Sequence, residues 1–334
     1  MERGIIMIKK MIINAGILLL MVIFSFNCSD EKHYSKKNRM LYSNVKDTRT
    51  HVRYLGQDYS KNEYNKLKRI ELREFKDQLK KQYKIPFKFR HTKYFNIAYR
   101  CSEYKMNRLQ NYLLAFFKDI YPRFFKYEPL HVVKIIYFKN WATFKRYSGS
   151  LAYGYFYPHL RTITTHAYSG YGTLWHELIH AFVHENGGSN VQEWFNEGFA
   201  SFYEMALLRN NKVIDGFTNW RMPSLQRSIR RKDYSPLKEI MVEQRFYQYF
   251  GYAQARFLFC YLRMYDVMDP FVKSYMYDLL PNYSGKKLGQ MAIKKIESLI
   301  GKNIDSIDKE FKMLAMRYQK YKKLHKKRRY AAQR

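Results

Sequence analysis

The sequence predicts an α+β protein, with a mixed α/β lobe over residues 86–187 and an all-helical lobe over residues 188–320. Three observations support this prediction. Strand-like runs of aromatic and branched residues occur before Gly187-Gly188 and not after it. Helical spacing of apolar residues occurs on both sides of that point. The chain has 334 residues, 46% of them hydrophobic, which is enough to bury a core.

A basic start and an apolar run predict that residues 1–28 are a signal peptide. The run Met11–Phe26 is shorter than the ~20 residues of a full membrane span. Cys28 follows it and resembles the lipidated cysteine of a bacterial lipobox, although Asn27 stands where that motif has a small residue. An ordinary cleaved signal and an uncleaved anchor stay open. We expect an extracytoplasmic protein of the bacterial cell envelope, held at the membrane by a lipid or an anchor, or else secreted.

The next segment, residues 29–85, is predicted to be a basic spacer that contains one amphipathic helix. Apolar residues recur at roughly helical spacing within residues 64–84, and Pro86 ends the pattern. The apolar positions are Leu67, Ile70, Leu72, Phe75 and Leu79.

The first lobe alternates strands and helices and ends in the helix that carries the main motif. Branched and aromatic runs indicate the strands, and Pro122 and Gly187-Gly188 are the stops of the two longer helices. We expect one or two strands in 87–99, a helix in 102–125, a strand at 131–138, a helix at 141–148, strands at 152–158 and 161–168, and a helix from about Thr173.

The second lobe shows only helical patterns. The predicted helices cover 191–208, 251–265, 270–280, 289–300 and 304–318. The charge run 318–334 has little to bury, so we expect a solvated end, with residues 321–334 as a basic tail.

The charge balance bears on the partners of the protein. Lysine and arginine number 61 against 28 acidic residues, a net charge of +33. This favours an anionic neighbour such as a membrane surface, a cell-wall polymer or nucleic acid, unless the surface is simply lysine-rich. Export makes nucleic acid unlikely. If Cys28 is lipidated, Cys101 and Cys260 remain, either paired or as buried thiols.

The stretch from Thr173 to Gly188 contains the pattern H-E-x-x-H at His176, Glu177 and His180. Histidines four residues apart leave the same face of a helix, and this spacing suits two ligands of one Zn²⁺. The glutamate between them is the general base of such sites. The alternative is a surface helix whose histidines face solvent.

His184 cannot be a further ligand of the same ion on an unbroken helix. It lies about 12 Å along the helix axis from His176 at ~1.5 Å per residue, far more than two bonds of ~2 Å can bridge. The metzincin pattern also fails, because Val183 and Asn186 stand where its glycine and third histidine belong. We expect His184 to be a solvated bystander.

A second helix can complete the ligand set. On it, Phe195, Phe199 and Phe202 share one face, and a polar stripe lies opposite, formed by Glu193, Glu197, Ser201 and Glu204. A carboxylate from this stripe would give the His₂Glu set of catalytic zinc.

H-E-x-x-H followed by N-E-G-F-A at residues 196–200 resembles the gluzincins, the thermolysin- and aminopeptidase-like zinc metallopeptidases. The resemblance implies a zincin-like fold and makes Glu197 the third zinc ligand. Slightly fewer residues separate His180 from Glu197 than in the typical aminopeptidase branch. This shorter separation is compatible with the looser peptidase MA-like relatives. The match covers roughly residues 86–266.

The same resemblance places a tyrosine at the start of a later helix, where it donates a hydrogen bond to the oxyanion. Tyr252 matches it, with Tyr247 and Tyr249 as rivals. The Gly-x-Met-Glu-Asn stretch of aminopeptidases is absent, which favours an endopeptidase. Residues 161–172 stand in its place, and a strand there could pair with an extended substrate.

The sequence therefore predicts an exported zinc metallopeptidase that acts on peptides or proteins. The alternative is a non-catalytic zincin-like surface protein that binds anionic polymers.

Overall fold

The computed structural model describes residues 51–54, 57–126, 129, 131–243 and 251–324. The predicted signal peptide with Cys28 and most of the predicted basic tail lie outside the described residues. The chain divides into a unit ending at Tyr64 and a second unit that begins at Asn65. No helix among the described residues is long and apolar enough to cross a membrane.

The described part of the first unit is a hairpin and the start of a helix. Strands β1 (His51–Tyr54) and β2 (Gln57–Ser60) pair antiparallel, and helix α3 (Lys61–Gln82) follows directly. Ser60 and Glu63 cap that helix reciprocally, since each side chain accepts a hydrogen bond from the other's backbone amide. The predicted spacer contained only the helix, so the prediction missed the hairpin.

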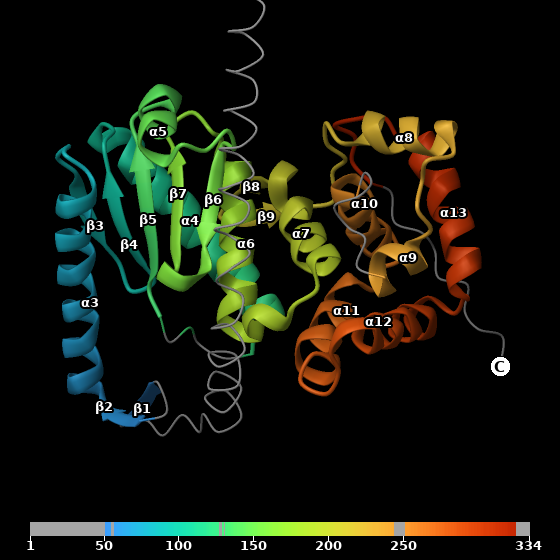
Figure 1. Cartoon of the computed structure of the whole chain (residues 1–334), viewed down its shortest axis with the longest axis horizontal. Helices are drawn as coiled ribbons and strands as arrows, with labels where there is room; N and C mark the ends of the chain where they lie inside the picture. The colour runs from blue at the N-terminus through green and yellow to red at the C-terminus, as the bar shows by residue number, and fades with distance from the viewer. Residues whose placement is uncertain (1–50, 55–56, 127–128, 130, 244–250, 325–334) are drawn as a thin grey trace, which may run out of the picture. The chain divides into compact units, whose positions relative to one another are not determined.

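The second unit contains a five-stranded mixed sheet in the order β3-β4-β5-β7-β6 (Figure 1). The central strands run parallel, and β3 and β6 pair antiparallel at the two edges. The strands are β3 (Lys88–His91), β4 (Phe95–Tyr99), β5 (Val133–Phe138), β6 (Gly154–Tyr157) and β7 (Thr162–His166). Each lies within a segment for which the sequence predicts a strand.

Helices cover both faces of this sheet. On one face Phe75 and Leu79 of α3 join Phe144 of α5 (Trp141–Ser148) against side chains of β4 and β5. On the other face α4 (Glu103–Phe124) and α6 (Tyr171–Gly187) pack their apolar residues onto the same strands. Because both faces are covered, all five residues of β4 are buried.

After α6 the chain is mostly helical. In Figure 1, α6 and α7 lie between the sheet and the remaining helices. The helices are α7 (Glu193–Phe202), α8 (Met222–Arg231), α9 (Leu237–Val242), α10 (Gly251–Met264), α11 (Met268–Ser274), α12 (Gly285–Ile300) and α13 (Ile304–Arg317). A single π-helical turn, Tyr275–Leu279, continues α11.

The prediction of an all-helical second lobe is wrong in one place. Helix α7 ends at Phe202, and β8 (Leu207–Arg209) and β9 (Lys212–Ile214) form a hairpin. Asn210 and Asn211 both have positive φ, 50° and 57°, which the tight turn requires and which asparagine tolerates. The short helices α8 and α9 were also not predicted. The α+β class itself is confirmed.

Residues 319–324 are not part of a solvated end. The backbone amide of Leu324 donates to the carbonyl of Gly216 at 2.9 Å, and the Leu324 side chain is buried. The hydroxyl of Thr218 donates to the carbonyl of Gln319 at 2.6 Å and accepts from the amide of Lys322 at 2.8 Å. These bonds fasten the last described segment to the loop that precedes α8.

Candidate metal centre

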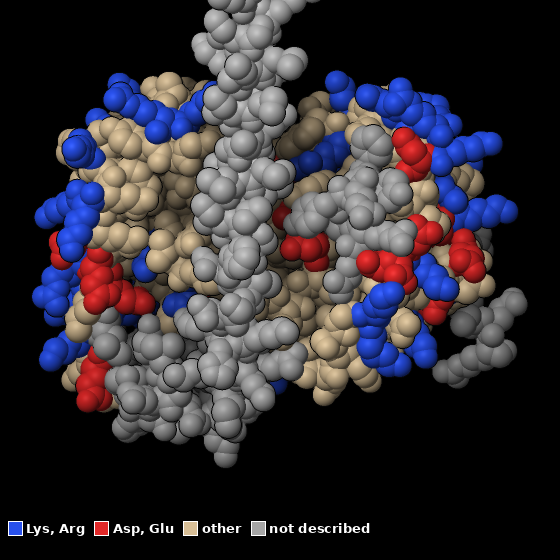
Figure 2. All heavy atoms as spheres, viewed as in Figure 1, with Lys and Arg blue, Asp and Glu red and all other residues tan. Residues whose placement is uncertain are grey.

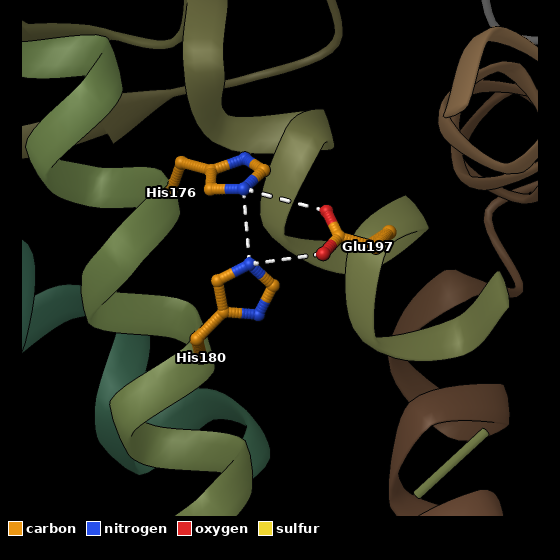
Figure 3. A group of neighbouring side chains, drawn as sticks. All are labelled: His176, His180 and Glu197. Carbon is orange, nitrogen blue, oxygen red and sulfur yellow. Dashed lines mark hydrogen bonds and ion pairs between the residues drawn. The ribbon is translucent and has the colours of Figure 1, made fainter. Parts of the chain in front are cut away.

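Three predicted ligands meet between α6 and α7 (Figure 3). Nε2 of His176 lies 2.9 Å from Nε2 of His180. The Glu197 carboxylate faces both nitrogens, with Oε2 at 3.5 Å from Nε2 of His176 and Oε1 at 3.6 Å from Nε2 of His180. Within the described part of the chain, no other three histidine, cysteine or carboxylate side chains bring ligand atoms within 4.8 Å of one another.

These distances can be compared with the requirements of zinc. Two atoms bound to one tetrahedral Zn²⁺ at ~2.0–2.1 Å lie about 3.3 Å apart. Both nitrogen-to-oxygen distances are close to this value, and the two nitrogens lie somewhat closer. Oε2 of Glu197 is buried and has no hydrogen-bond partner among the described residues. A carboxylate oxygen placed in this way fits a metal ligand.

The other nitrogen of each histidine has an oxygen beside it. Nδ1 of His180 lies 2.9 Å from Oδ1 of Asn196, an acceptor that fixes the proton on Nδ1 and leaves the lone pair on Nε2. Nδ1 of His176 lies 3.2 Å from Oε1 of Glu204. Both Nε2 atoms, which face each other, are therefore prepared as ligands.

Glu204 is held firmly although it lies in a 3₁₀ turn after α7. Arg221 donates to both of its oxygens, at 2.8 Å from Nη2 and 3.3 Å from Nε, and Asn219 adds a bond of 2.8 Å. A Cβ added at Gly172 on α6 would overlap the backbone oxygen of Glu204. The glycine therefore lets this turn lie directly against the helix that carries His176.

The charges of the cluster shift its pKa values. Burial alone would lower the pKa of His176, but the adjacent carboxylates of Glu197 and Glu204 and the charge of Glu177 outweigh it and raise that pKa to about 10. Burial disfavours the charged form of Glu204, yet His176 and Arg221 lower its pKa to about 2. The pKa of Glu197 is lowered by both histidines against the effect of burial.

Glu177 lies one residue from the first ligand and is 7% exposed. Burial raises its pKa, and the nearby histidines oppose this. The backbone amide of Phe156 in β6 hydrogen-bonds to its carboxylate. A buried carboxyl of raised pKa next to a metal centre has the properties of a general base.

His184 is a bystander in the cluster, but the prediction that it is solvated is wrong. It is half-buried, with its ring 5.9 Å from that of Phe156. Burial and the charge of Arg161 lower its pKa to about 4. Its ring is therefore neutral at ordinary pH and acts as packing.

Tyr252 lies in the first turn of α10, and the guanidinium of Arg221 lies 5.4 Å from the centre of its ring. Arg221 also binds Glu204, so the tyrosine is connected to the metal cluster through two side chains. Tyr247 and Tyr249 lie outside the described residues.

Three supporting residues were not predicted: Asn196, Asn219 and Arg221. Asn196 could have been found, since it precedes Glu197 within the quoted motif. Glu204 belonged to the predicted polar stripe without a role. That stripe is divided, because Glu193 is exposed and Ser201 is fully buried.

One further expectation is corrected, and one open alternative is decided. The strand in 161–172 is β7, which pairs with β5 on one side and β6 on the other, so neither of its edges can accept a substrate. Strand β6 is at the edge instead. Cys101 and Cys260 are both free, and Cys260 is completely buried, where Nη1 of Arg256 lies 3.2 Å from its sulfur.

A scan against models of protein families finds no match for this chain, and a comparison with curated proteins finds none either. The geometry of the cluster is therefore the basis for a function.

Proposed function

We propose that the chain is an exported zinc-dependent metallopeptidase with a zincin-like fold, in which His176, His180 and Glu197 hold the ion. The observation that supports it most is the spacing of these three ligand atoms beside the buried Glu177. Two histidines and one glutamate form the ligand set of several hydrolytic zinc enzymes and leave a fourth position for water or substrate.

The chemistry follows from the residues around that position. Zinc, when bound, lowers the pKa of a water and polarises a carbonyl. Glu177 takes the proton of the attacking water and passes it to the leaving amine. Asn196 and Glu204 hold the two imidazoles, and Tyr252 supplies a hydrogen-bond donor for the developing oxyanion.

Strand β6 supports a polypeptide substrate. It is the last strand of the sheet among the described residues, and the amide of Phe156 on it hydrogen-bonds to Glu177. An extended peptide that adds to this edge would run beside the proposed base. The sequence lacks the Gly-x-Met-Glu-Asn stretch that holds the free amino group of the substrate in aminopeptidases, and we therefore propose an endopeptidase.

The test is Glu177→Gln, with Glu193→Gln as its control. Glu193 is exposed on α7 and leaves the cluster unchanged. We expect the wild-type protein to bind one zinc per chain and to cleave unfolded protein substrates. Glu177→Gln should keep the zinc and lose about 10²–10⁴-fold in kcat/KM. Absence of zinc binding at micromolar concentration, or full activity in Glu177→Gln, contradicts the proposal.

A second function is favoured by the charge distribution. Figure 2 shows lysine and arginine side chains gathered over α3, α5 and α8. Arg227, Arg230 and Arg231 of α8 are all exposed. A protein that only binds anionic polymers would show an affinity that falls with salt and survives chelation of zinc, with no hydrolysis.

A further inference from the structure

We infer that Arg221 is a positioning residue that sets the geometry of both ends of the proposed active site, the ligand His176 through Glu204 and the oxyanion donor Tyr252 through its ring. The inference rests on the proposed function.

The first contact leads to the metal. Arg221 holds both carboxylate oxygens of Glu204, and Oε1, which accepts the shorter of the two bonds, is also the oxygen 3.2 Å from Nδ1 of His176. The Glu204 side chain is 6% exposed and that of Arg221 is 26% exposed, so water competes little for this pair. This bidentate contact fixes the orientation of the Glu204 carboxylate, and the carboxylate in turn fixes the orientation of the His176 imidazole.

The second contact leads to the oxyanion side. The carbon of the guanidinium lies 5.4 Å from the ring centre of Tyr252, within the range of a cation–π interaction. It lies equally far from Trp220, which is partly exposed. A planar guanidinium can bind a carboxylate along its edge and an aromatic ring on its face at the same time, and an ammonium group cannot.

Arg221 is itself held in place by its neighbours. Its backbone amide donates to Oδ1 of Asn219 at 2.9 Å, and the same asparagine donates to Glu204. Asn219 is 1% exposed and follows Thr218, which is tied to residues 319–322. The arginine is therefore a preorganised bridge between the 3₁₀ turn that follows α7 and the start of α10, and not a mobile surface residue.

The experiment compares Arg221→Met and Arg221→Lys with Arg227→Met. Arg227 is an exposed arginine on α8, the helix that begins directly after Arg221, so its replacement removes an equal charge without touching the site. We expect Arg221→Met to weaken zinc binding by about 10–100-fold in a competition with a chelator. The absorption spectrum of the Co²⁺-substituted protein should also change. Arg221→Lys should recover part of the zinc affinity but not the spectrum, and Arg227→Met should match the wild type in both.

The second readout separates the tyrosine end. In a double-mutant cycle, the variant that carries both Arg221→Met and Tyr252→Phe should lose less kcat than the product of the two single fold-losses. Both changes weaken the same hydrogen bond from the tyrosine to the oxyanion. If the wild type binds zinc and hydrolyses peptides while Arg221→Met keeps its zinc affinity, Co²⁺ spectrum and kcat, this inference fails and the proposed function stands. If the wild type binds no zinc, both fail. Should Arg221→Met not fold, Glu204→Gln with Arg221→Lys tests the same bridge.

Discussion

His184 lies one turn beyond His180, the second proposed ligand on α6, and is kept neutral by its surroundings. Burial and the charge of Arg161 hold its pKa near 4, against an ordinary value of 6.5, while Glu185 opposes them and His159 and His131 contribute smaller effects. The folded protein therefore resists taking up a proton that the unfolded chain accepts. Acid conditions should for this reason act on the helix that carries the ligands.

The prediction concerns stability against pH. A histidine whose folded pKa is depressed lowers the free energy of unfolding as the pH falls from 6.5 towards 4. This interval corresponds to about 3 kcal/mol. His184→Gln should remove most of that loss, as measured by urea unfolding between pH 4 and 7.5. His159→Gln, at an exposed histidine whose charge has only a small effect on the pKa of His184, is the control and should remove only a small part of that loss, so an equal change in both variants would contradict the assignment.

The sequence was sufficient to predict the site residues that lie close together in the chain. It was not sufficient to predict the residues that support them from distant segments. His176, Glu177 and His180 lie within one turn of helix, so their spacing alone places them on one face. Glu197 required the resemblance as well. Glu204 and Arg221 meet only because the β8–β9 hairpin returns the chain, and contacts across such a return leave no periodic signal in the sequence.

Close approach of helices is the main feature at the scale of elements. Gly198 follows Glu197, the third proposed ligand, and a Cβ at Gly198 would lie 2.8 Å from the carbonyl oxygen of Ala255 on α10. The glycine of the motif thus allows α7 and α10 to pack in contact. Gly172 has the same role between α6 and the turn that carries Glu204. The site depends on glycines that contact no ligand.

This argument can be tested with Gly172→Ala. The added methyl group must push the turn with Glu204 away from α6, at a cost of about 1–3 kcal/mol. Zinc affinity should fall as well, because the carboxylate moves from His176. Gly289→Ala is a matched control, since a Cβ at Gly289 overlaps the backbone oxygen of Met241 in the same way but away from the metal centre. It should lower the melting temperature and leave zinc affinity unchanged. Equal loss of zinc affinity in both would refute the role of Gly172.

The elements themselves show where sequence patterns suffice. The sheet and α6 were predicted within a few residues, because their apolar runs are long and bounded by glycine or proline. The helix predicted for 191–208 ends at Phe202, since a hairpin of three-residue strands is too short for an alternation to appear. Pro223 and Pro236 mark the starts of α8 and α9 and were available as signals.

For the whole molecule, the important connection is the one between the last described residues and the metal centre. Residues 319–324 form hydrogen bonds with Gly216 and Thr218. Asn219 and Arg221, which follow in the chain, bind Glu204. The Glu204 carboxylate in turn lies beside His176. The connection runs through hydrogen bonds to Thr218, through the backbone from Thr218 to Asn219 and Arg221, and then through hydrogen bonds and ion pairs to His176.

Truncation tests this connection. A chain that ends at Tyr318 loses these bonds and the buried Leu324, which should lower the free energy of unfolding by about 2–5 kcal/mol and weaken zinc binding. A chain that ends at Leu324 removes part of the basic tail and keeps every described contact. It should bind zinc as the full chain does. Equal zinc affinity of both truncated chains, measured on folded protein, would show that the segment does not reach the site.

The fastening of Gly216 and Thr218 by residues 319–324 also sets an order of events during synthesis. His176 and His180 leave the ribosome well before Leu324, and at about 5–20 residues per second the interval is on the order of ten seconds. During that interval His176 and His180 have been synthesised, but residues 319–324, which help to position the Glu204 carboxylate, have not. If the chain is the zinc hydrolase that we propose, it should therefore retain zinc poorly and become fully active only after the last described residues are made.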